Sequence, residues 1–238
     1  MTATSRDLMR TKRRQAMSRT LPARIPLTLE PALAPALGWK RPFDLVLGTI
    51  ALVGALPLVL CLALAVVLDS PGPAFFGQER VGREGRRFRM WKLRSMRAGC
   101  DHAAHRRAAA RWFAGRPTGD GYKSLDDPRI TRLGRILRRT NLDELPQLLN
   151  VVKGDMSLVG PRPGIPYELV HYTPTDFQRL SVPPGITGLW QVSRRDRLSA
   201  AEMIELDLRY VRQASLWLDL RILFRTVPAV LGSARRGV

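Results

Sequence analysis

The longest hydrophobic segment of the chain runs from Leu45 to Leu68 and contains no charged side chain. An α-helix rises 1.5 Å per residue, so a helix of this length is long enough to cross the hydrocarbon core of a bilayer. Pro57 lies at its midpoint and Gly54 is close by. A proline inside a helix removes a backbone hydrogen bond, so the pattern predicts a kink there.

Basic residues flank this hydrophobic segment on both sides. The positive-inside rule favours placing both flanks on the cytoplasmic side. We therefore predict a re-entrant membrane helix that breaks at Pro57 and returns to the same face. A kinked helix that crosses the membrane is the alternative. The flanking basic residues are Arg10, Lys12, Arg13, Arg14, Lys40 and Arg41 before the segment, and Arg80, Arg83, Arg86, Arg87, Arg89 and Lys92 after it.

A second amphipathic pattern precedes the sequence TNLDELPQLLNVV. Ile130, Leu133, Ile136 and Leu137 recur at helical spacing, and arginines occupy the other face. This basic amphipathic helix suits an anionic surface, although its apolar face could equally lie in the core.

We expect a further helix to start near Asp143, capped by Thr140 or Asn141, with Pro146 in its first turn. Asp143 and Glu144 would then lie at a helix N-terminus. Neighbouring side chains in mid-helix point apart, but at a helix start both carboxylates can converge on a metal ion or a phosphate. An ionised aspartate can act as a nucleophile without a general base. The alternative is that the two acidic residues merely complement the helix dipole.

The rest of the chain shows shorter patterns. Residues 74–96 alternate around Gly82 and Gly85 and predict a β-hairpin. A short strand follows in GDMSLVG, and a buried strand is expected over Leu189 to Val192, where Trp190 is assigned to packing. Further helices are expected in two short pieces of PYELVHYTPTDFQRL, from a capping box of Ser199 and Glu202 to about Gln213, and over the apolar SLWLDLRILFRTVPAVL.

Composition limits the partners. At 238 residues with a net charge of +19, the protein needs a polyanionic neighbour, and charge alone does not separate nucleic acid from anionic lipid. Residues 1–38 read as a flexible basic tail. Cys61 and Cys100 imply no disulfide framework. His102, His105 and His171 form no metal-site pattern, and His102 and His105 are assigned to the solvated surface.

Several blocks in this order resemble the bacterial sugar transferases known as monotopic phosphoglycosyl transferases, the undecaprenyl-phosphate sugar phosphotransferases. The resemblance covers Lys40 to the C-terminus. The blocks are KRPFD, QERVG, KLRSM, LRRTNLDELPQLLNVVKGDMSLVGPRP, PGITGLWQV, LDLRYV and SLWLDLRIL. Leu56 departs from the small polar residue that often precedes the break proline in this family.

The resemblance implies a mainly α fold with a small β-hairpin, a re-entrant helix-break-helix broken at Pro57, and amphipathic interfacial helices. It divides the chain into a basic tail (residues 1–38), a membrane segment (39–72) and a cytoplasmic catalytic domain (73–238) at the bacterial inner membrane. It implies that Asp143 is the nucleophile and that Glu144 binds Mg²⁺. Four further residues are implied to bind substrate phosphate or nucleotide: Lys92, Arg138, Arg162 and Asp207. A surface salt bridge is the alternative for Asp207.

The implied reaction transfers a sugar 1-phosphate from a UDP-sugar to undecaprenyl phosphate and releases UMP, as the first membrane step of exopolysaccharide or other surface glycan synthesis. The implied partners are these two substrates and anionic membrane lipid, with a homo-oligomer possible and no nucleic acid. Two other classes fit the composition less well: a noncatalytic scaffold of a polysaccharide assembly complex and a membrane-tethered nucleic-acid binder. The sequence does not distinguish the sugar.

Overall fold

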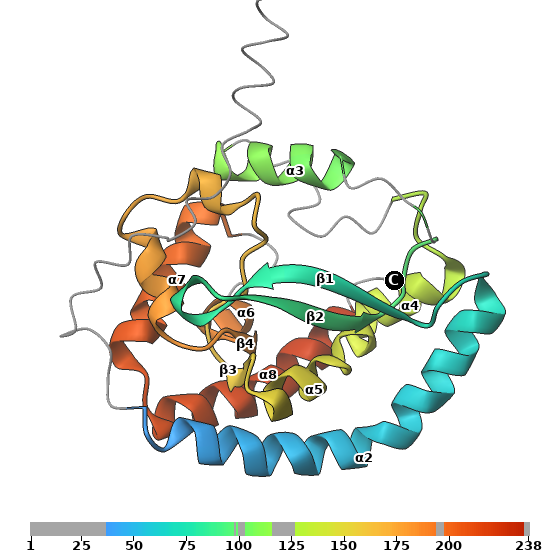
Figure 1. Ribbon diagram of the computed structural model, residues 1–238, viewed down its shortest axis with the longest axis horizontal. Helices are drawn as coiled ribbons and strands as arrows, with labels where there is room; N and C mark the ends of the chain where they lie inside the picture. The colour runs from blue at the N-terminus through green and yellow to red at the C-terminus, as the bar shows by residue number, and fades with distance from the viewer. Residues whose placement is uncertain (1–36, 98, 100–102, 116–126, 194–197, 236–238) are drawn as a thin grey trace, which may run out of the picture.

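The computed structural model describes residues 37–97, 99, 103–115, 127–193 and 198–235. The fold is mainly helical, as predicted, with two small two-stranded sheets. The predicted basic tail lies almost wholly outside the described residues. The described chain begins just before α2, the long helix Lys40–Asp69 that curves along the lower edge of the molecule in Figure 1.

Helix α2 is long and apolar enough to cross a membrane. Pro57 lies inside it, and the residues form one curved helix in place of two helices separated by a break. Most of its large apolar side chains are exposed, including Ile50, Val53 and Leu64 at 63–65 % of their full area. The re-entrant path through a membrane stays a prediction.

Both ends of α2 are fastened to the body of the protein by buried polar side chains. At the N-terminal end, Lys40 forms an ion pair with Asp219, and Asp44 accepts a hydrogen bond from the backbone N–H of Leu158 at 2.9 Å. At the C-terminal end, the buried guanidinium of Arg94 donates to backbone carbonyls of residues 66 and 70–72. Arg94 therefore joins the C-terminal end of α2 and the turn that follows it to the end of the hairpin.

The predicted hairpin is confirmed. Strands β1 (Phe75–Val81) and β2 (Arg87–Leu93) pair antiparallel around a 3₁₀ turn, η2, at Arg83–Gly85. The predicted strand in GDMSLVG is β3 (Ser157–Val159), which pairs in parallel with β4 (Gly185–Thr187). The strand expected over Leu189 to Val192 is wrong: Leu189–Ser193 is helix α6, and the buried strand lies just before it. Trp190 packs beside buried Met203 and Ile204, as predicted.

The remaining helices enclose these strands. Helix α3 spans Ala103–Phe113, α4 spans Arg132–Thr140, α5 spans Gln147–Lys153, α7 spans Ala200–Gln213 and α8 spans Leu216–Arg235. Two 3₁₀ helices, η4 (Leu169–His171) and η5 (Asp176–Ser181), confirm the two short helical pieces, and the Ser199–Glu202 capping box of α7 is present. The main core gathers side chains from β2, α5, β3, α7 and α8.

Helix α5 lies close against α2. A Cβ atom built on Gly48 would stand 2.9 Å from Cγ1 of Val151, so a larger residue at position 48 would push the two helices apart.

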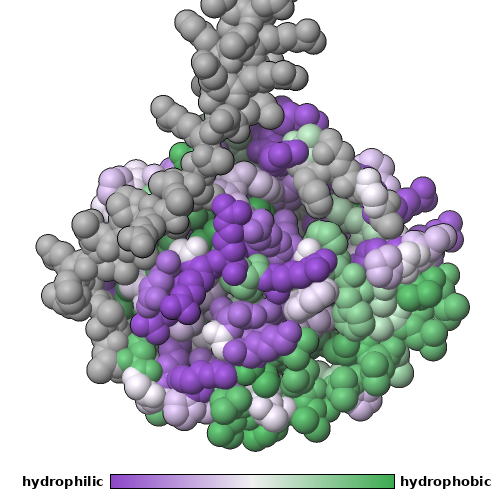
Figure 2. Space-filling view, viewed as in Figure 1, coloured by the Kyte–Doolittle hydropathy of each residue, from purple (hydrophilic) through white to green (hydrophobic). Residues whose placement is uncertain are grey.

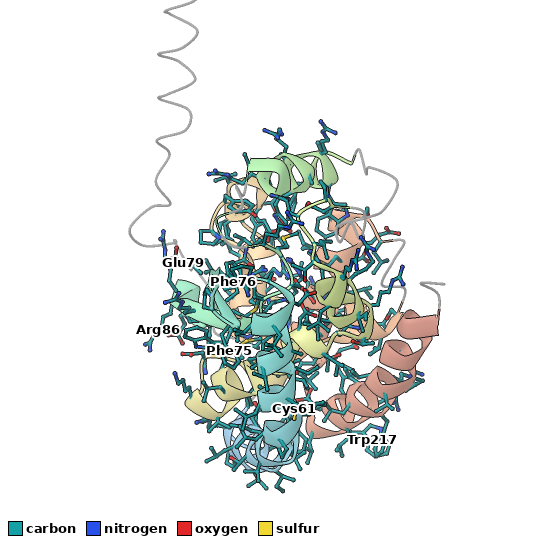
Figure 3. All side chains as sticks on the ribbon, turned by 90° about the vertical axis from the view of Figure 1, so that its right-hand side faces the viewer. Cys61, Phe75, Phe76, Glu79, Arg86 and Trp217 are labelled. Carbon is teal, nitrogen blue, oxygen red and sulfur yellow. The ribbon has the colours of Figure 1, made fainter. Side chains whose placement is uncertain are left out.

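The surface is divided by polarity. Figure 2 shows hydrophilic side chains over the hairpin and apolar side chains over the C-terminal half of α2. Helix α8 adds exposed Trp217, Phe224 and Val227. In Figure 3, Cys61 of α2 and Trp217 of α8 both lie on the lower side of the molecule. The exposed large apolar side chains of α2 and α8 are called the apolar face below. They are Leu45, Val46, Ile50, Val53, Leu56, Leu58, Leu60, Leu64, Val67 and Leu68 of α2, and Leu216, Trp217, Phe224 and Val227 of α8.

Candidate active site

The acidic pair lies in a tight turn between two helices. The Thr131 side chain caps α4, accepting from the Gly134 backbone N–H at 3.0 Å. Asn141 ends α4 in the left-handed region (φ 57°, ψ 17°), which asparagine tolerates better than most residues. The chain then makes one 3₁₀ turn, η3 (Leu142–Glu144), before α5 begins.

This geometry corrects the predicted helix start. No continuous helix begins near Asp143, because α5 starts only at Gln147, with Pro146 just before it. Thr140 does not cap the next helix: its hydroxyl lies against the carbonyl oxygens of Ile136 and Leu137, the nearer at 2.9 Å.

Helix α4 directs only part of its apolar face into the protein. Leu137 is fully buried beside Val66 of α2 and Leu93 of β2, whereas Ile136 is 57 % exposed. Ile130 precedes the helix and pairs with Met96. At Gly134 the helix lies against the chain that leaves the hairpin, where an added Cβ would stand 2.1 Å from the Ser95 carbonyl oxygen. The α4 helix is therefore fixed between α2 and the hairpin.

The hairpin brings a lysine to the acidic turn. Lys92 lies near the end of β2, and its Nζ donates to Oε1 of Glu144 at 2.8 Å. Both side chains are about one-fifth exposed, at 20 % and 18 %. The neighbouring Asp143 is only 3 % exposed. Two carboxylates and one ammonium group therefore lie together, as the predicted site requires.

Arg138 completes this first group. It lies in the last turn of α4, where burial lowers the pKa of its guanidinium. Asp143 and Glu144 oppose that shift, so both carboxylates lie within electrostatic reach of Arg138. Arg138 therefore places a second positive charge, besides Lys92, within electrostatic reach of the two carboxylates.

The second group surrounds the Pro161-Arg162-Pro163 turn. The Arg162 guanidinium contacts the fully buried Glu168 at 3.3 Å, and its backbone N–H donates to Asp207. Arg80 of β1 donates to the Pro163 carbonyl oxygen at 2.9 Å. Contacts with Arg80, Glu168 and Asp207 thus hold the turn in place.

Asp207 is fully buried in α7, and its carboxylate contacts the buried guanidinium of Arg179. Burial raises the pKa of Asp207 to about 6, and the Arg179 charge opposes the rise. The salt bridge of Asp207 is therefore buried, and the alternative of a surface salt bridge is wrong. Arg179 also donates to the Arg162 carbonyl oxygen at 3.0 Å. Asp207 therefore holds the turn in place both directly, through the Arg162 backbone N–H, and through Arg179.

Sequence reasoning missed Arg179, Glu168 and a histidine. His105 is not a solvated surface residue: its Nδ1 lies 2.5 Å from the Tyr167 hydroxyl. Burial lowers the pKa of His105 to about 4, and Arg162 and Arg138 contribute to the decrease. His105 thus lies within electrostatic reach of both arginine groups. Arg179 and Asp207 are 28 residues apart and His105 and Tyr167 are 62 apart, while Arg162 and Glu168 meet across an irregular turn, so only the fold reveals these partners. His102 lies outside the described residues.

The donor set can accommodate magnesium bound partly through substrate. Within the described part of the chain, no three His, Cys, Asp or Glu side chains gather to hold a metal. Mg²⁺ in phosphate-transfer sites commonly uses only one or two carboxylates together with substrate phosphates and water. Asp143 and Glu144 supply that minimum. Pro57, the predicted membrane break, lies in α2 and contributes no group to either cluster.

A cavity of about 230 Å³ opens beside the acidic turn. Its walls come from the turn itself, α5, β4, α6 and α8, and among the described residues Glu144 is the only ionisable one in its lining. The turn therefore faces charged groups on one side and a mainly apolar hollow on the other.

The profile of one family, described as bacterial sugar transferase, matches residues 36–233. The chain belongs to the bacterial sugar transferase family. The Lys92–Glu144 pair, Asp143 and the Arg162 turn all fall within the matched part of this family member.

Relatives of the family member support this assignment. It is 44 % identical over 192 residues to an undecaprenyl-phosphate galactose phosphotransferase of Salmonella typhimurium, covering 81 % of this chain and 40 % of the relative. It is 43 % identical over 197 residues to a UDP-glucose:undecaprenyl-phosphate glucose-1-phosphate transferase of Xanthomonas campestris pv. campestris, covering 79 % and 38 %. The chain thus spans about two-fifths of the length of these relatives.

A third relative is similar along most of its own length. The exopolysaccharide production protein ExoY of Sinorhizobium fredii is 40 % identical over 196 residues, covering 80 % of this chain and 84 % of the relative.

Proposed function

We propose that this protein transfers a sugar 1-phosphate from a UDP-sugar to undecaprenyl phosphate, giving undecaprenyl-diphosphate-sugar and UMP. The observation that carries the proposal is the turn Leu142–Glu144, which holds two carboxylates beside Lys92 and Arg138 in a member of the bacterial sugar transferase family. The printed names of two relatives, which include undecaprenyl phosphate and a sugar or sugar phosphate, support the substrate classes.

In the first half-reaction, a carboxylate oxygen of Asp143 attacks the sugar-linked phosphorus of the diphosphate. A bond from this oxygen to phosphorus forms, the bridging P–O bond breaks, and UMP leaves with the electron pair. The main obstacle is repulsion between the attacking carboxylate and the diphosphate. Lys92 and Arg138 reduce it because both place positive charge next to the acidic turn.

In the second half-reaction, a phosphate oxygen of the lipid attacks the same phosphorus and Asp143 leaves as a free carboxylate. No general base is needed, because an ionised phosphate is already nucleophilic. Two steps at one anion site spare the enzyme from holding both anionic substrates at once. This is a physical reason for a covalent intermediate.

The remaining charged residues hold the substrates. Arg162 offers a planar guanidinium on a rigid turn, which suits a bidentate phosphate or uracil contact. Asp207 acts through Arg162 and Arg179, because it is fully buried. Glu144 would hold Mg²⁺, which would neutralise part of the diphosphate charge when bound.

We place this reaction at the cytoplasmic face of the bacterial inner membrane, as the first membrane step of exopolysaccharide or another surface glycan. The exposed apolar side chains of α2 support attachment to a bilayer, since water-exposed patches of this size are unusual on soluble proteins. The charge of +19 suits the anionic inner leaflet.

The test is turnover of a UDP-sugar panel with undecaprenyl phosphate by the protein in lipid nanodiscs. We expect Asp143→Asn to lower turnover at least about 10³-fold, because the nucleophile is removed. Glu79→Gln is the matched control, since Glu79 is an exposed hairpin carboxylate paired with Arg87. Equal, measurable turnover by Asp143→Asn and the parent would contradict Asp143 as the nucleophile, and a lack of turnover by the parent with every donor would favour the scaffold alternative.

A further inference from the structure

The cavity beside Glu144 has mainly apolar walls. Leu145 and Leu148 form the side next to the acidic turn, Ile186 and Val192 form another, and Ala229 of α8 completes it. Its volume of about 230 Å³ is below the ~300–1,000 Å³ of pockets that hold drug-sized ligands. It is suited to a short stretch of an apolar chain.

The polar groups in the wall bond mainly to the protein itself. The hydroxyls of Thr187 and Thr226 lie 2.8 Å apart, and Thr226 also donates to the Ile222 carbonyl oxygen. The Gln191 amide nitrogen donates to the Ile186 carbonyl oxygen at 3.1 Å, and its Oε1 is the one buried acceptor in the described wall that has no hydrogen-bond partner. A sugar or a uracil ring needs several free hydrogen-bonding groups, and these walls provide few of them.

The cavity also joins two parts of the molecule that a lipid substrate must reach. Its lining includes Glu144, which is paired with Lys92 in the candidate active site. The lining also includes Thr226 and Ala229 of α8. On the outer side of this helix, Phe224 is 78 % and Val227 61 % exposed, and both belong to the apolar face.

The geometry points to this cavity as the site for the first isoprene units of the polyprenyl phosphate acceptor. The chain carbons next to the phosphate occupy the cavity while the phosphate lies at the Lys92–Glu144 end. The rest of the chain runs across α8 into the membrane. This inference rests on the proposed function, because it deepens the identification of the acceptor.

The kinetic test uses Ala229→Phe, which fills the cavity, in the full chain in nanodiscs. Its matched control is Ala201→Phe, the same substitution at an exposed position of α7 that is not among the residues lining the cavity. Excluding even two methylene equivalents from an apolar site costs about tenfold in affinity. We expect the KM for farnesyl phosphate to rise about tenfold or more in Ala229→Phe, and the KM for the UDP-sugar to stay within about twofold.

The milder variant Ala229→Leu covers the case in which phenylalanine disturbs folding, and we expect a smaller rise in the same KM. A shorter acceptor, dimethylallyl phosphate, should lose less than farnesyl phosphate in both variants because it leaves less chain to exclude. A rise no larger than that of Ala201→Phe would overturn the inference. A rise in the donor KM alone would also overturn it, because the cavity would then serve the sugar nucleotide.

A labelling readout is independent of turnover. Farnesyl phosphate carrying a diazirine on its first isoprene unit is photolysed with the protein, and the labelled residues are mapped by mass spectrometry. We expect label on residues 186–192 and 226–229 that unlabelled farnesyl phosphate displaces and Ala229→Phe abolishes. Label confined to α2 would contradict the inference.

Labelling of the cavity by a parent that releases no UMP from any UDP-sugar would mean that only the proposed reaction fails. UMP release without cavity labelling would mean that only the cavity assignment fails.

Discussion

Two acid–base pairs in this protein have similar chemistry and different surroundings. Lys40 and Asp219 are 3 % and 0 % exposed, and the Tyr210 hydroxyl donates a further hydrogen bond to Asp219 at 2.7 Å. Lys92 and Glu144 are about one-fifth exposed and lie beside a cavity and the nearly buried Asp143. The first pair joins α2 to α8, and the second joins the hairpin to the acidic turn.

The difference shows how burial separates a structural pair from a reactive one. A fully buried ion pair is closed to ligands. Removing one partner leaves the other charge buried with neither an opposite charge nor water to stabilise it. A partly exposed pair adds little to stability and can exchange its partner for a substrate phosphate. The Lys40–Asp219 pair should therefore control folding, and the Lys92–Glu144 pair should control turnover.

The largest expected effect is on the buried pair. Lys40→Met leaves the Asp219 carboxylate buried without its ammonium partner, and we expect it to lower the free energy of unfolding by about 3–5 kcal/mol. Denaturant unfolding in detergent micelles measures this. Lys153→Met is the control, because Lys153 is exposed in the last turn of α5. Equal midpoints for the two variants would refute the structural assignment of the first pair.

The side chain of His105 is half-buried against Tyr167, so a change in its protonation should affect stability. Burial lowers the pKa of its imidazole from the ordinary value of 6.5 to about 4 in the folded protein. Between these pH values the unfolded chain binds more protons, so this contribution to stability is complete above about pH 6.5 and declines as the pH falls toward 4. We expect a loss of up to about 3 kcal/mol.

Unfolding of the parent and of His105→Gln across this pH range measures the contribution. The variant should lose less stability on acidification, since it has no imidazole to protonate. Identical pH profiles would contradict the assignment.

A smaller free-energy effect is expected at the reactive pair, and it should appear in catalysis. Lys92→Met should lower kcat/KM for the UDP-sugar about 10²-fold, or about 2.7 kcal/mol, because a cation facing the diphosphate is lost. Its free energy of unfolding should change by no more than about 1 kcal/mol. Steady-state kinetics and denaturant unfolding of the same sample test both parts. Full activity of Lys92→Met together with a large loss of stability would contradict the comparison, because Lys92 would then have a structural role.

Local patterns in the sequence predicted much of the fold. The charge-free run, the alternation around Gly82 and Gly85 and the Ser199–Glu202 capping box each reflect contacts within a few residues, and each gave the element found. The strand expected over Leu189 to Val192 was wrong because short apolar segments suit either a strand or a helix. The continuous helix expected from Asp143 was wrong because the chain makes one 3₁₀ turn, Leu142–Glu144, and α5 begins only after Pro146, which has no backbone N–H to donate.

The motif residues of the candidate site could be predicted from the sequence. The residues that hold them in place could not, because the fold brings these partners to them. The resemblance singled out Asp143, Glu144 and Lys92, and the structure brings them together. Arg179 and Glu168 had no local signal, because their partners Asp207 and Arg162 come from other elements or from an irregular turn. Buried ion pairs between distant segments are fixed by packing, which a single sequence does not reveal.

The most direct measurement of the central claim is the intact mass of the protein after incubation with Mg²⁺ and each of a panel of UDP-sugars, without lipid acceptor. The account predicts a mass increase of one sugar phosphate with the correct donor, reversed on addition of undecaprenyl phosphate and lacking in Asp143→Asn. The same adduct on Asp143→Asn, or catalytic turnover by a parent that never carries it, would contradict a covalent role for Asp143.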